Sequence, residues 1–190
     1  KTTNLVLAGN PPDAIQKYLH NDLAPFFDTD ERTIRGSLDK TVTILLKVWA
    51  RPVAELQSFH RSAVELYNHL PSHERILVHW GLTMSAYPFW GAVASSVGRL
   101  LNLQGTASAN QVQRRLREQY GERETVARRA RYVLRSFVDW GVLQESSIKG
   151  TYTNGIKLVV SQPGSIAWLI EAALHARPQK SAPFQEIITS

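Results

Sequence analysis

Apolar residues recur at intervals of three and four along most of this chain of 190 residues, in segments that proline or glycine interrupts. A stripe with this period covers one face of an α-helix, and proline or glycine at its borders ends the helix. The pattern therefore predicts a mainly helical protein, with Ile34 on the apolar face of the second helix. We expect helices at residues 11–19, 30–49, 53–69, 72–80, 88–103, 109–120, 125–140 and 166–176.

Polar residues that precede several of these segments support the helix boundaries. Ser108 and Gln111 form the S-x-x-Q pattern of a capping box. Ser72, Thr125 and Ser165 are each expected to cap the helix that follows, because a hydroxyl oxygen accepts a hydrogen bond from the unpaired N–H groups of a first turn.

The period changes after Gly141. β-branched and aliphatic residues at 142–143 and 156–160 are separated by turn signals at 147–150 and 154–155, which predicts a β-ribbon. The expected fold class is mainly α. It comprises a helical subdomain at residues 1–83 and a second domain at residues 84–190 that contains the ribbon, a final helix and a tail.

Composition places the chain among ordinary globular proteins, with 43% hydrophobic and 20% charged residues. It has no cysteine, which excludes disulfides and cysteine catalysis and favours a cytoplasmic location. The apolar stretch at residues 5–8 is too short for a secretion signal. Residues 41–50, interrupted by Lys47, fall well short of the roughly 20 apolar residues that a membrane span needs.

The net charge of +6 is confined to the C-terminal half. Residues 1–83 hold nine basic and nine acidic side chains, whereas residues 84–190 hold thirteen basic and seven acidic. Eight arginines and no lysine lie at 106–141. Basic surfaces attract nucleic acid through long-range fields, so this segment is the first place to look for function.

The helix expected at 125–140 separates its residues into two faces. At about 100° per residue, Val126, Ala130, Val133 and Phe137 cluster on one side. The opposite side is basic, while Arg129 falls nearer the apolar border. An ordinary solvent face mixes charges of both signs, but residues 125–136 contain four arginines and no acid. The outward side carries Arg128, Arg131 and Arg135, with Tyr132 beside them.

Helix, short helix, polar turn, helix and two-stranded ribbon at residues 84–160 resemble the winged helix-turn-helix superfamily of DNA-binding proteins. The resemblance implies that the third helix enters the major groove, that the preceding helix and turn contact phosphates, and that the ribbon touches backbone or minor groove. The candidate DNA-binding residues are Arg114, Arg115, Arg117, Arg123, Thr125, Arg128, Arg129, Arg131, Tyr132, Arg135, Lys149, Tyr152, Asn154 and Lys157.

The expected function is sequence-specific or shape-selective binding of double-stranded DNA. The protein would act as a bacterial transcription regulator or as the non-enzymatic DNA-binding subunit of a larger complex. In size and plan the chain is similar to the BrxA accessory proteins of BREX phage-defence systems. The N-terminal helices would then form a homodimer or dock onto the complex. The alternative is a protein-protein interaction module whose arginine face binds an acidic partner.

Other chemistry has weaker support. His60, His69, His73 and His79 lack the spacing of a metal motif. The acids at residues 28–31 lack the glycine and distal glutamate of a calcium loop. No phosphate loop or G-x-S-x-G motif occurs, so we expect no enzymatic activity, metal or cofactor. The five tryptophans are expected to anchor cores: Trp49, Trp80, Trp90, Trp140 and Trp168.

Overall fold

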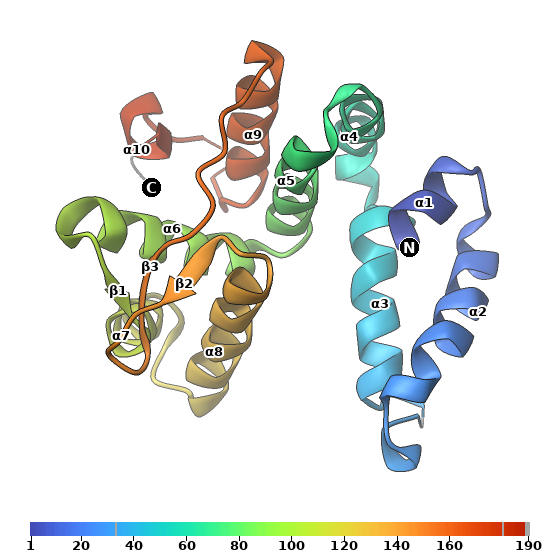
Figure 1. The fold of residues 1–190 in the computed structure, drawn as a ribbon, viewed down its shortest axis with the longest axis horizontal. Helices are drawn as coiled ribbons and strands as arrows, with labels where there is room; N and C mark the ends of the chain where they lie inside the picture. Colours follow the sequence, from blue (N-terminus) through green and yellow to red (C-terminus); the bar gives the residue numbers. More distant parts are fainter. Residues whose placement is uncertain (33, 180, 189–190) are drawn as a thin grey trace. The chain divides into compact units, whose positions relative to one another are not determined.

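A computed structural model describes residues 1–32, 34–179 and 181–188, and shows a mainly helical protein with a small three-stranded antiparallel sheet (Figure 1). The mainly α class is thereby confirmed. The chain divides into two compact units, Lys1–Leu82 (the first unit) and Thr83–Ser190 (the second unit). Within the described residues, no helix combines the length and apolar content needed to cross a bilayer.

The first unit consists of helices joined by short 3-10 turns. Pro12 occupies the first position of α2, where its missing N–H leaves no hydrogen bond unmade. Ile15 and Leu19 of this helix pack with Leu38, Val42 and Leu46 of α3 as a continuous core. The elements are α1 (Thr2–Leu7), α2 (Pro12–Leu23), η1 (Ala24–Phe26), η2 (Thr29–Arg32), α3 (Ser37–Trp49), η3 (Ala54–Leu56), α4 (Gln57–His69), η4 (Ser72–Glu74) and α5 (Ile76–Ala86), which crosses the boundary between the units.

The second unit surrounds the sheet with helices. Its sheet has the strand order β1-β3-β2, with Tyr152 of β3 opposite both Ala107 and Glu145. Helices α6, α7 and α8 pack against one another. The rings of Trp90 in α6 and Phe137 in α8 pack edge to face, with 4.7 Å between their centroids. The elements are α6 (Pro88–Gln104), β1 (Ala107–Ser108), α7 (Ala109–Tyr120), α8 (Glu124–Asp139), β2 (Leu143–Glu145), β3 (Thr151–Asn154), α9 (Pro163–His175) and α10 (Phe184–Ile188).

The tryptophans differ in how far they are buried. Trp49, Trp90 and Trp168 belong to buried cores, as expected. Trp80 and Trp140 are half-buried, and Trp140 lies against Trp90.

The helix expected at 30–49 begins later than the sequence indicates. Arg35 has a positive φ of 64°, which an α-helix does not allow, and α3 starts only after Gly36. Ile34 therefore lies outside the helix and is 92% exposed. Its spacing from Leu38 matches the apolar stripe, but the backbone does not continue the stripe that far.

The ribbon prediction was wrong about the second strand. The N–H of Thr151 donates to the carbonyl of Ile148, and the N–H of Ser146 donates to the carbonyl of Thr151, so the chain reverses at 147–150, the first of the two turn signals, and the second strand follows directly. β3 occupies Thr151–Asn154, while the aliphatic run at 156–160 lies beyond the sheet, with Val159 83% exposed.

Gly155 follows β3 in close contact with the segment before β2 and forms no hairpin turn, since its N–H donates to the carbonyl of Val142. A Cβ at this position would lie 2.1 Å from the carbonyl oxygen of Gly141, so only glycine allows the two backbones to approach. This contact explains why an Asn-Gly pair stands where no turn forms.

Of the predicted helix caps, only Ser108 is confirmed, by a complete capping box with Gln111. α8 begins at Glu124 with Arg123 as its N-cap, so Thr125 already lies in the first turn. α9 begins at Pro163, which leaves Ser165 buried inside the helix.

The helix expected at 72–80 differs at both ends, and two short helices were missed. A 3-10 turn or a short helix has too few residues to show a helical period. Ser72 starts the 3-10 turn η4, and α5 then runs to Ala86, beyond the expected end at Trp80. The short helices α1 and α10 were not expected from the sequence.

Candidate nucleic-acid interface

Helix α8 is fixed in the second unit by its apolar face. Val126, Ala130 and Phe137 are buried there, as the sequence predicts, together with Ala127 and Leu134. Val133, also expected on this face, is only half-buried. A helix held along its whole length by buried side chains presents its outer face at a fixed angle, which is what recognition of a rigid ligand requires.

The outer face of α8 carries guanidinium groups without acidic partners. Arg128, Arg129 and Arg131 are exposed, and within the described residues none of the three forms an ion pair or hydrogen bond through its side chain. Arg129, expected near the apolar border, is exposed like the other two. The ring of Tyr132 lies on the same face and is 69% exposed. We call these four residues the α8 face.

Arg135 has a different environment from the α8 face. Its Nε donates to Asp139 at 3.1 Å, and its Nη1 lies 3.9 Å from Glu145 of β2. Tyr152 of β3 is opposite Glu145, and its pKa is raised by burial first and by Glu145 second, with Arg135 acting against the shift. Arg135 therefore links α8 to the sheet and brings less unbalanced charge to the surface.

Two arginines of α7 form weak ion pairs. Arg114 lies 3.9 Å from Glu118, and Arg117 lies 3.9 Å from Glu122. Exposed pairs of this kind contribute little to stability, so a phosphate can replace the carboxylate at small cost. Arg123 is exposed at the N-terminus of α8, without a side-chain capping bond.

The remaining predicted residues lie at separate places. Thr125 is exposed in the first turn of α8, and Lys149 is exposed in the loop between β2 and β3. Asn154 ends β3, and Lys157 lies in the segment after it, where both are exposed. Tyr152 is half-buried within the middle strand. The structure thus gathers the α8 arginines on one face but distributes the ribbon residues over a loop, a strand and the segment beyond it.

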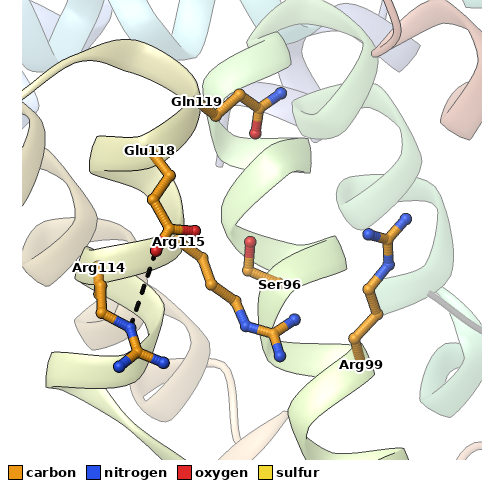
Figure 2. Close-up of a pocket in the computed structure, with 6 residues that line it drawn as sticks. All are labelled: Ser96, Arg99, Arg114, Arg115, Glu118 and Gln119. Carbon is orange, nitrogen blue, oxygen red and sulfur yellow. Dashed lines mark ion pairs between the residues drawn. The ribbon is translucent and has the colours of Figure 1, made fainter.

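A pocket of about 500 Å³ lies between α6 and α7 (Figure 2). Arg114, Arg115, Glu118 and Gln119 line it from α7. Ser96 and Arg99 line it from α6, and neither was predicted from the sequence. Arg99 is the single charged residue in α6, and this isolated charge is the sequence signal that could have identified it.

Two histidines of the first unit, His60 and His79, are packing residues, whereas His69 and His73 are exposed. His60 donates through Nε2 to the carbonyl of Trp49 at 2.8 Å, and the rings of His79 and Tyr67 meet the edge of Trp49. Burial lowers the pKa of both His60 and His79.

In the part of the chain that the structure describes, no group of three or more histidine, aspartate or glutamate side chains is placed to hold a metal ion. The side chains of the candidate interface are the arginines described above and the exposed ring of Tyr132. Comparison with protein families, curated proteins and solved structures finds no match to this chain.

Proposed function

We propose that the second unit binds double-stranded DNA with the α8 face. The observation that carries this proposal is the charge of that face: Arg128, Arg129 and Arg131 are exposed without carboxylate partners in the described residues, on a helix whose other side is buried. Three unbalanced guanidinium groups repel one another, and a polyanion relieves that repulsion.

The shape of α8 suits the major groove. A groove about 12 Å wide accepts one α-helix, and the planar guanidinium group binds either guanine O6 and N7 or a phosphate in bidentate fashion. Tyr132 adds an exposed ring beside these groups, which suits contact with a thymine methyl group or with the sugar backbone.

Neighbouring residues extend the interface to flanking phosphates. Arg123 precedes α8, and Arg114 and Arg117 exchange a weakly held carboxylate for a phosphate in the complex. Lys149 projects from the loop between β2 and β3, which we assign as the wing. The order α6, α7, turn, α8 and ribbon supports a winged helix-turn-helix as the fold of this unit.

The biological role that fits this proposal is that of a bacterial regulator or of a non-enzymatic DNA-binding subunit, as in a BrxA-like phage-defence complex. The first unit, with balanced charges, would supply the contact to a second copy or to the complex. Its exposed Phe26, Ile34 and Ile44 are suited to such a contact because they are large and apolar.

The test is fluorescence anisotropy of a labelled DNA duplex at several salt concentrations. Replacement of Arg128, Arg129 and Arg131 by alanine should weaken binding by more than about 100-fold and reduce the salt slope by about 2 to 3. The matched control replaces Lys17, Lys40 and Arg61, which are exposed in the first unit, and removes the same charge.

Two results would contradict the proposal. Equal weakening by the control would reduce the effect to net charge. Equal competition by an acidic peptide of the same charge would favour the protein-interaction alternative, because groove geometry would then be irrelevant.

A further inference from the structure

The pocket between α6 and α7 has an unusual charge balance for a cavity of its size. Arg99, Arg114 and Arg115 line it against a single carboxylate, Glu118. A volume of about 500 Å³ is within the range typical of small-molecule sites. None of its lining residues comes from α8, β2 or β3, so it is distinct from the α8 face.

Arg115 is the central cation of the pocket. Figure 2 shows its side chain extending from α7 toward α6, with Arg114 to one side and Arg99 to the other. Arg115 is half-buried, and among the described residues it has no ion pair or side-chain hydrogen bond. Partial burial of an unpaired cation is unfavourable, and an anion in the pocket would offset that cost.

Arg99 already holds a carboxylate from the chain itself. Its Nη2 donates to Oε1 of Glu186 in α10 at 3.0 Å, and Nη1 of Arg177 donates to the same oxygen at 3.1 Å. The carboxylate is 44% exposed, so this contact can exchange with a ligand in solution. The contact shows that Arg99 is positioned to bind an oxyanion.

The other lining groups limit the kind of ligand. The hydroxyl of Ser96 donates to the carbonyl of Ala92 at 2.9 Å, so the donors that remain among the lining residues are the guanidinium groups and the Gln119 amide. The lining residues include no aromatic or aliphatic side chain that would bind an apolar group. A compact, multiply charged oxyanion fits these donors, and phosphate groups match the planar geometry of arginine.

We propose that this pocket binds a small phosphate-bearing ligand through Arg99 and Arg115, and that the ligand takes the place of Glu186 on Arg99. The proposal does not depend on DNA binding. It assigns to α10 the role of an internal competitor, because the helix supplies the carboxylate that the ligand replaces.

Isothermal titration calorimetry of the full chain with pyrophosphate at low salt tests this site. Arg115→Gln and Arg99→Gln should each weaken binding by about tenfold or more, because each removes charge-assisted hydrogen bonds. Glu186→Gln should strengthen binding by about threefold or more, because it removes the competing carboxylate. Arg128→Gln is the matched control, with the same change on the α8 face, and should leave pyrophosphate binding unchanged.

Three results would overturn the proposal. Equal weakening by Arg128→Gln would show general attraction of anions to a basic unit. Weaker binding by Glu186→Gln would show that the carboxylate does not compete. A loss of duplex affinity in Arg99→Gln as large as its loss of pyrophosphate affinity would identify the DNA backbone, and not a separate ligand, as the source of the phosphate. Circular dichroism of each variant confirms that the affinities refer to folded protein.

Discussion

Both units concentrate ionisable residues in a short stretch of sequence, yet the two stretches reach opposite environments. In the first unit, His60 and His79 lie half-buried around Trp49 and contribute to packing. In the second unit, the arginines of the α8 face are exposed and lack acidic partners in the described residues. A cluster of ionisable residues in the sequence is therefore a candidate binding surface only where its side chains are exposed and have no carboxylate partners.

The largest change in stability is expected from truncating Phe137, whose packing holds α8 in the second unit. Phe137 is 1% exposed and meets Trp90 edge-on. Phe137→Ala should lower the free energy of unfolding by about 3–5 kcal/mol, because it leaves a cavity under α8. Urea denaturation measures this change. Phe184→Ala, at an exposed ring of α10, is the control and should cost less than about 0.5 kcal/mol. Similar losses for both variants would mean that the aromatic contact does not anchor α8.

The next effect separates two arginines of the same helix. Arg131→Ala should reduce duplex affinity by about 1–3 kcal/mol, because Arg131 has no partner among the described residues. Arg135→Ala should reduce it by less than half as much, since Asp139 and Glu145 already balance that charge. Anisotropy titrations at one salt concentration measure both. A greater loss for Arg135→Ala would show that the two acids orient this side chain toward DNA and do not neutralise it.

A smaller change in stability is expected when His60 and His79 of the first unit become protonated at low pH. Burial holds the pKa of His60 and His79 below the ordinary value of 6.5, so the unfolded chain binds these protons more readily than the folded chain. Their contribution to stability is therefore complete above pH 6.5 and is lost as pH falls below it.

Urea midpoints at pH 8 and pH 5 measure this loss for the native chain. A double variant, His60→Gln with His79→Gln, should flatten the dependence, whereas His73→Gln, at an exposed position, should not. A dependence that stays equally steep in the double variant would assign it to other groups.

Much of the helical architecture follows from local sequence. Helices α6, α7 and α8 match the expected ranges closely because their apolar stripes end at clear signals, such as the left-handed Gly105 after α6. The strand β3 did not follow from composition. Its residues are Thr-Tyr-Thr-Asn, and the more aliphatic run at 156–160 attracted the prediction although it lies outside the sheet.

Two of the charge pairs could not be predicted, because their partners are distant in sequence, unlike Arg135 and Asp139, which lie four residues apart on one helix. Glu145 reaches Arg135 only after the chain turns from α8 into β2, and Glu186 reaches Arg99 from α10 across 87 positions. Spacing on a helical wheel predicts which arginines point outward, but it contains no information on carboxylates from other elements. For this reason the sequence placed Arg128, Arg131 and Tyr132 on the outward side of α8, but it missed the exposure of Arg129, the contact of Glu145 with Arg135 and the pocket at Arg99.

The smallest expected effect is a gain in duplex affinity, whereas most substitutions at an interface weaken binding. Glu118→Gln with Glu122→Gln removes the carboxylates near Arg114 and Arg117, and should raise duplex affinity by about two- to fivefold because each exposed pair contributes less than about 1 kcal/mol. Glu55→Gln with Glu65→Gln in the first unit removes the same charge at exposed positions, and it corrects for the general increase in positive charge. A gain equal to that of the control would show that Arg114 and Arg117 do not reach the phosphates. A gain larger than that of the control would show that the acids near an arginine, more than the number of arginines, determine which surface of this protein binds a polyanion.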